Sequence, residues 1–117
     1  MSQLTTHILD TTKGKPATGV DIVLYYIVNS DPMAIGWKEM TRGITNNDGR
    51  IPNLLNKDVV LEHGVYKMLF QTKPYFDKQN IKTFYPYVEI VFEINSSEHY
   101  HIPLLLNPYG YSTYRGS

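Results

Sequence analysis

Short segments in which apolar and polar residues alternate constrain the fold of this chain most. Every second residue from Val20 to Val28 is apolar, and from Tyr87 to Ile94 one set of alternate residues is wholly apolar while the other includes two glutamates. Successive side chains of a β-strand point to opposite faces, so this two-residue period places one face of each strand against a core. Helical character is weak and confined to residues 73–81, where Pro74 suits a first helical turn.

Further strands are predicted over residues 4–9, 37–45, 65–71, 99–106 and 111–115, with turn residues between them. The strongest turn signal is the run Asn46-Asn47-Asp48-Gly49, because Asp-Gly readily supplies positive φ angles. Residues 10–16 are also expected to form a turn. Seven to eight short strands with one short helix predict an all-β fold, an antiparallel β-sandwich. No linker or shift in composition divides residues 1–117, so we expect a single domain.

Charge and composition exclude several classes of function. The chain has 11 basic and 11 acidic residues and no basic run of the kind that contacts a nucleic-acid backbone. It has no cysteine, which excludes disulfides, thiolate nucleophiles and zinc–thiolate sites. No apolar stretch approaches the roughly 20 residues that span a bilayer, and the first residues lack a signal-peptide pattern. We therefore expect a cytoplasmic protein that binds neither nucleic acid nor membrane.

The closing segment, residues 99–117, is predicted to form a hairpin with polar groups on its outer face. His99, His101, Pro103 and Leu105 share the face of the first strand that points away from the core. The two imidazoles, about 6 to 7 Å apart by strand rise, could join a metal site with a third ligand from elsewhere, carry protons, or lie on the surface.

Two further residues are open to more than one interpretation. Near the N-terminus, His7 shares a strand face with Thr5 and Leu9, and is either a catalytic imidazole or a hydrogen-bonded sheet residue. Arg50 directly follows the Asp-Gly turn, and on pattern alone it is a solvated cation at a strand edge. Pattern alone therefore predicts a sandwich with histidines on its strand faces, without a substrate.

Three segments together closely resemble the 5-hydroxyisourate hydrolases of the transthyretin-like family. They are Leu4-Thr5-Thr6-His7-Ile8-Leu9-Asp10, Thr45-Asn46-Asn47-Asp48-Gly49-Arg50, and His99-Tyr100-His101-Ile102-Pro103-Leu104-Leu105-Leu106 with the closing Tyr114-Arg115-Gly116-Ser117. The resemblance spans the whole chain in the same order, and the closing tetrapeptide separates these hydrolases from the hormone-carrying transthyretins. One departure is Asn107, where the family usually has Ser; it lies in the predicted turn, and we expect little effect.

The resemblance implies an assembly, a reaction and a site. The family's sandwiches pair edge to edge into dimers and then into a homotetramer, a dimer of dimers with active sites in a channel at the dimer–dimer interface. The family hydrolyses 5-hydroxyisourate, a product of urate oxidation, to 2-oxo-4-hydroxy-4-carboxy-5-ureidoimidazoline without metal or cofactor. Carried over residue by residue, the catalytic residues are His7, Arg50 and His101. The substrate-binding residues are His7, Arg50, Tyr114 and Ser117.

Three other interpretations make different predictions. A transthyretin-like carrier would hold an aromatic ligand in its channel without chemistry, and it has no need of His7, Arg50 and His101 in combination. A zinc hydrolase built on His99 and His101 would lose its activity on chelation. A structural sandwich with incidental histidines would require three matched motifs to be a coincidence. The sequence therefore favours a metal-free hydrolase.

Overall fold

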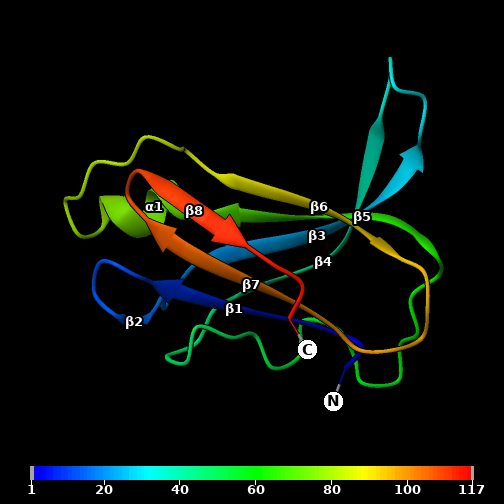
Figure 1. Ribbon diagram of the computed structural model, residues 1–117, viewed down its shortest axis with the longest axis horizontal. Helices are drawn as coiled ribbons and strands as arrows, with labels where there is room; N and C mark the ends of the chain where they lie inside the picture. The colour runs from blue at the N-terminus through cyan, green and yellow to red at the C-terminus, as the bar shows by residue number, and fades with distance from the viewer. Residues whose placement is uncertain (1, 117) are drawn as a thin grey trace.

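The protein, described over residues 2–116 by a computed structural model, folds into two four-stranded sheets and one short helix (Figure 1). One sheet has the strand order β2-β1-β7-β8 and the other the order β4-β3-β5-β6. The first sheet contains β1 (Leu4–Asp10), β2 (Lys15–Pro16), β7 (Tyr100–Asn107) and β8 (Gly110–Thr113). The second contains β3 (Asp21–Asn29), β4 (Gly36–Ile44), β5 (Gly64–Gln71) and β6 (Val88–Ile94). The predicted β-sandwich is confirmed.

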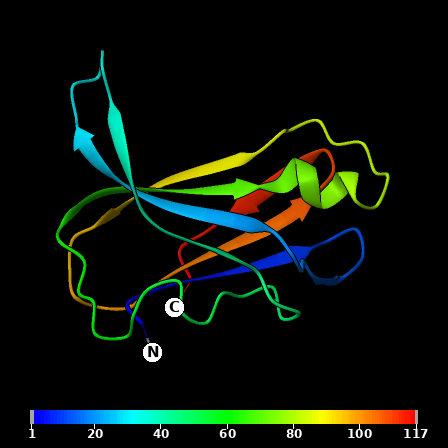
Figure 2. The same ribbon diagram turned by 180° about the vertical axis from the view of Figure 1, so that it is seen from behind.

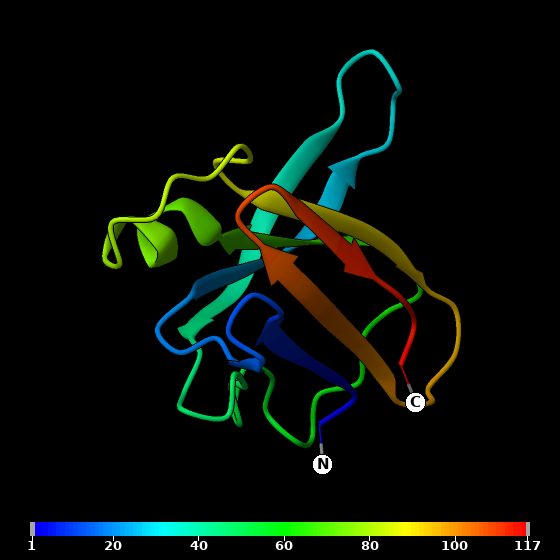
Figure 3. The same ribbon diagram turned by 60° about the vertical axis from the view of Figure 1, so that its left-hand side comes forward.

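One pair of strands departs from the expected antiparallel arrangement. Within residues 2–116, β1 and β7 are parallel, whereas the other ladders are antiparallel. The two strands lie side by side in Figures 1 and 3, with Leu4 opposite Tyr100 and Asp10 opposite Leu106. The chain crosses to the second sheet between them and returns in the same direction. The first strand of the chain is therefore the direct neighbour of the second-last strand.

The core lies between the sheets and is built mainly from the alternate residues that the sequence assigned to it, although Val28 near the end of β3 is 58% exposed. All four predicted core residues of β7 are buried: Tyr100, Ile102, Leu104 and Leu106. Large apolar side chains from both sheets have no exposed surface, among them Leu4, Ile8, Ile22, Leu24, Met68 and Phe70.

Several details differ from the sequence-based expectations. Pro103 was expected to face outward with His101, but it is buried, because β7 is an interior strand with β1 and β8 on either side. A two-residue strand, β2, pairs with β1 inside the segment expected to be only a turn. β8 ends at Thr113, so Arg115 lies beyond the strand predicted for it.

A short helix, α1 (Thr72–Asp77), follows β5 directly and ends before residue 81, where the weak helical pattern stops. In the view from behind, α1 lies at one end of the second sheet and the β3–β4 hairpin projects from the other (Figure 2). Tyr75 of α1 donates a hydrogen bond to the buried carboxylate of Asp10 at the end of β1, at 2.7 Å. The helix thus ties the second sheet to the first. No helix in the described part of the chain is long and apolar enough to cross a membrane.

Candidate active site

The loop after β4 places Arg50 next to β1, near the start of the chain. Gly49 has a φ of +72°, as the Asp-Gly signal predicted, and its carbonyl accepts the backbone N–H of Ile8 at 2.9 Å. The side-chain oxygen of Asn46 accepts the backbone N–H of Arg50 at 3.1 Å, which closes the turn. A Cβ atom on Gly49 would collide with the carbonyl oxygen of Ile8 and lie 3.3 Å from Cδ2 of His7. Only glycine allows so close an approach at this angle.

This docking places a guanidinium beside an imidazole. Nη2 of Arg50 lies 3.5 Å from Nδ1 of His7. Arg50 is exposed, whereas His7 is half-buried on the outer face of β1. The sequence pattern alone described Arg50 as a solvated cation, and it could not reveal this contact across the fold.

His101 lies on the same outer face, on the neighbouring strand. The parallel register pairs Thr5 with His101 and His7 with Pro103. His7 and His101 therefore lie on adjacent strands and are offset by two residues along the strand direction. Nδ1 of His101 lies 2.8 Å from Oγ1 of Thr5. The structure therefore brings three of the predicted site residues, His7, Arg50 and His101, to one surface.

A third histidine belongs to this surface. Nε2 of His99 lies 2.9 Å from the same Thr5 oxygen, and the rings of His99 and His101 are 6.3 Å apart and inclined by 21°. Within residues 2–116, no group of three or more histidines and carboxylates is placed to hold a metal ion. Thr5 was not among the predicted site residues, although its position two residues before His7 placed it on the same strand face.

The C-terminal tail packs against His101. The backbone N–H of Gly116 donates to the carbonyl of His101 at 2.8 Å. A Cβ atom on Gly116 would lie 2.6 Å from Cδ2 of His101. Glycine at this position therefore allows the tail to lie directly on the imidazole.

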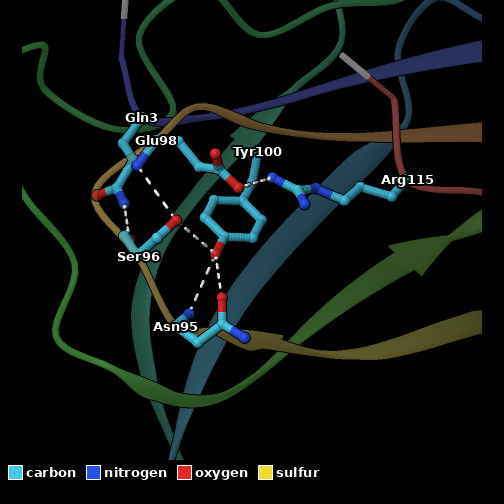
Figure 4. Close-up of polar contacts among 6 residues, drawn as sticks. All are labelled: Gln3, Asn95, Ser96, Glu98, Tyr100 and Arg115. Carbon is cyan, nitrogen blue, oxygen red and sulfur yellow. Dashed lines mark hydrogen bonds and ion pairs between the residues drawn. The ribbon is translucent and has the colours of Figure 1, made fainter.

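An ion pair and an aromatic ring anchor the tail just before that contact (Figure 4). Arg115 donates to the carboxylate of Glu98 at 2.7 Å, and its guanidinium carbon lies 4.3 Å from the centre of the Tyr100 ring. The hydroxyl of Tyr100 donates to the side-chain oxygen of Asn95 at 2.9 Å and accepts the backbone N–H of Asn95 at 3.1 Å. Ser96 lies 3.0 Å from the same hydroxyl. The ring is thus a fixed platform for the tail.

Two predicted site residues remain, Tyr114 and Ser117. Tyr114 is 59% exposed and lines a cavity of about 230 Å³ with Ile90 and Phe92 of β6, at the edge where the two sheets meet. Neither His7 nor Arg50 lines this cavity. Ser117 lies outside the described residues.

Burial and positive charge favour neutral imidazoles at this surface. Burial lowers the pKa of His7, and the nearby Arg50 guanidinium lowers it further. The pKa of His101 is lowered by burial and by the positive charges of Arg50, His99 and His7. A neutral imidazole can accept a proton, which a histidine already charged at neutral pH cannot.

The match to a family model assigns this fold and surface to a known family. The model of the HIUase/Transthyretin family matches residues 4–116. The chain belongs to this family. A Schizosaccharomyces pombe member, described as a probable 5-hydroxyisourate hydrolase, is 46% identical over 115 residues, which cover 97% of this chain and 90% of the relative.

The chain is similar to solved structures of both a hydrolase and a transthyretin. The 5-hydroxyisourate hydrolase of Klebsiella pneumoniae superposes with a TM-score of 0.82 at 33% identity, covering 99% of this chain and all of that one. Sea bream transthyretin in complex with thyroxine superposes with a TM-score of 0.86, also at 33% identity, covering 97% of this chain and 94% of that one. Backbone similarity therefore does not distinguish the hydrolase from the transthyretin.

Proposed function

We propose that this protein hydrolyses 5-hydroxyisourate to 2-oxo-4-hydroxy-4-carboxy-5-ureidoimidazoline without a metal or cofactor. The observation that carries the proposal is the grouping of His7, Arg50 and His101 on one face of the first sheet, with 3.5 Å between Arg50 and His7. The relatives described as 5-hydroxyisourate hydrolases support it, because they match nearly the whole chain. A hormone carrier needs no proton acceptors at this position.

The reaction requires water to attack a ring carbonyl, and the carbon–nitrogen bond of that carbonyl then breaks. One of His7 and His101 takes the proton of the water as its oxygen bonds to the carbonyl carbon. The other orients the water or gives a proton to the departing ring nitrogen, so that the ring opens to a carboxylate. Arg50 holds the oxygens of the substrate and stabilises the negative charge that develops on the attacked carbonyl.

The site also requires a cover. Arg50 is exposed and both histidines are only half-buried in the single chain, so bulk water reaches them. We propose that a second copy covers this face in a homotetramer, a dimer of dimers with the site at the dimer–dimer interface. Tyr114 and Ser117 of the tail would then contact the substrate within the closed channel. A mass measured in solution by light scattering tests this assembly, and a monodisperse monomer that is fully active would contradict it.

The deciding experiment generates 5-hydroxyisourate from urate with urate oxidase and follows its ultraviolet decay with and without the protein in EDTA. Wild-type protein should accelerate the decay, and His7→Asn or His101→Asn should lower turnover by about 100-fold or more, as expected for the loss of general acid–base catalysis. His63→Asn is the matched control, because His63 is exposed in a loop before β5. Full activity in His101→Asn would remove His101 from the mechanism.

A carrier is the second candidate, favoured by the similarity to a thyroxine-bound transthyretin. Decay no faster than the spontaneous rate, from a folded oligomer, would support the carrier and overturn the hydrolase. Activity that is abolished by EDTA and restored by zinc would instead support a metal site at His99 and His101.

A further inference from the structure

Thr5 forms a bridge between two imidazoles through a single hydroxyl. Its Oγ1 lies 2.8 Å from Nδ1 of His101 and 2.9 Å from Nε2 of His99. A threonine hydroxyl has one proton to donate and can accept on its lone pairs. It can donate to only one of the two histidines, so at least one of the two facing ring nitrogens carries a proton and donates to Thr5. When Thr5 donates to one ring, the three side chains form a hydrogen-bonded chain with a single direction.

The direction of the chain determines which nitrogen of His101 carries the proton. If Thr5 donates to His99, then Nδ1 of His101 is protonated and donates to Thr5, which leaves Nε2 of a neutral His101 with a free lone pair. If Thr5 instead donates to His101, then Nε2 carries the proton. Among the hydrogen bonds of residues 2–116, none is made by Nε2 of His101, so this nitrogen is available to a substrate or water.

The hydrogen bond between Thr5 and Nδ1 of His101, together with the charges around the ring, favours the first direction. The groups that act on the ring are the Arg50 guanidinium from the loop after β4, His7 on β1 and His99 just before β7, and each disfavours additional positive charge on it. Thr5 on β1 and the backbone of Gly116 are its neutral neighbours. A ring that these charges keep neutral can take a proton from water only at Nε2, because Nδ1 is bound to Thr5, and a neutral ring with a free lone pair on Nε2 carries its proton on Nδ1.

We propose that Thr5, supported by His99, is a positioning residue that keeps the proton of His101 on Nδ1 and leaves Nε2 as the proton acceptor of the active site. The catalytic part of this inference rests on the proposed hydrolase function. It assigns His101 as the residue that takes the proton from water, and it leaves the orienting or proton-donating role to His7.

The test measures the tautomer directly. In full-length protein labelled with ¹⁵N at histidine, long-range ¹H–¹⁵N correlation spectra distinguish the protonated from the unprotonated ring nitrogen, and His101→Asn identifies the signals of His101. Wild-type protein should show His101 protonated at Nδ1. Thr5→Val keeps the shape of the side chain but removes the hydroxyl, and should move the proton to Nε2. Thr5→Ser keeps the hydroxyl and should restore the wild-type pattern.

Activity provides the second measurement. Outer partners that orient a functional histidine typically change activity by about 10-fold to 100-fold, so kcat should fall by this amount in Thr5→Val and recover in Thr5→Ser. The matched control is Thr6→Val, which removes the hydroxyl of the residue that follows Thr5. The Thr6 hydroxyl lies on the core side of β1 and donates to the carbonyl of Ile102 at 2.7 Å. Thr6→Val should change neither the tautomer nor kcat beyond what its loss of stability explains.

Three outcomes separate this inference from the proposed function. Wild-type His101 protonated at Nε2, or a tautomer that Thr5→Val leaves unchanged, would overturn the role of Thr5. A shifted tautomer with unchanged kcat in Thr5→Val would overturn its part in catalysis. If the wild-type protein does not accelerate the decay of 5-hydroxyisourate at all, the proposed function fails, while the tautomer spectra still decide whether Thr5 orients His101.

Discussion

Replacing Gly116 with alanine should damage the proposed active site without unfolding the protein. The new Cβ would lie 2.6 Å from Cδ2 of His101 and 3.2 Å from its Cβ and Cγ. Carbon atoms in favourable contact are about 3.5 Å apart or more, so the tail and the imidazole must separate by about 0.9 Å. The ring is held by Thr5 at 2.8 Å, and the backbone of Gly116 is held by the carbonyl of His101 at 2.8 Å. One of these hydrogen bonds must lengthen.

A displacement of about 1 Å in a catalytic group can lower the rate by about 100-fold, which corresponds to about 2.7 kcal/mol of transition-state stabilisation. The decay assay with 5-hydroxyisourate should therefore show kcat/KM reduced by about this factor in Gly116→Ala. The midpoint of thermal unfolding should change little, because the tail lies after the last strand of the fold. Gly110→Ala is the matched control, since the nearest atom to its Cβ, Nδ2 of Asn107, lies 3.6 Å away in ordinary contact. Wild-type kcat/KM in Gly116→Ala would refute the close packing of the tail on His101.

Two further predictions concern the buried carboxylate and the charge of the site. Tyr75→Phe removes the hydroxyl that donates to Asp10, a residue that is 1% exposed. Burial of Tyr75, and then the hydrogen bond to Asp10, raise the pKa of Tyr75 to about 12, so the native hydroxyl stays protonated and remains a donor. The free energy of unfolding in urea should fall by about 1 to 3 kcal/mol, and an unchanged midpoint would contradict this. Arg50→Gln removes a cation that disfavours the charged form of both imidazoles, so the pKa values of His7 and His101 should rise. Titration followed by NMR measures both, and pKa values that stay the same or fall would show that Arg50 does not lower them.

The sequence predicted the faces of the strands more reliably than their partners. Alternation in residues 99–106 identified the core residues of β7 and placed His101 on the outer face, because a two-residue period is a local property of the chain. The parallel pairing of β1 with β7 has no comparable local signal. The same limit applies to Pro103, which lies on the predicted face but is buried by its neighbouring strands.

The candidate site could be predicted only in part for the same reason. His7 was a possible catalytic residue on its strand face, and the turn at residues 46–49 was predicted from Asp-Gly. The contact between Arg50 and His7 depends on Gly49 docking against Ile8, two segments about 40 residues apart that only the tertiary fold brings together. Thr5 was not identified because a threonine in a strand is ordinary until its hydroxyl is seen between two imidazoles.

The parallel ladder of β1 and β7 also has a consequence for the order in which the protein is made. Thr5 and His101 are 96 positions apart in the chain, yet they are neighbours in one sheet. During synthesis, β1 and the loop with Arg50 leave the ribosome well before β7 exists, so β1 has an unpaired edge toward the missing strand throughout that interval. Long-range pairing of this kind slows folding, because the entropic cost of closing the long intervening loop must be met before the two strands form stabilising contacts. The surface proposed to be catalytic is therefore among the last parts of the molecule to form.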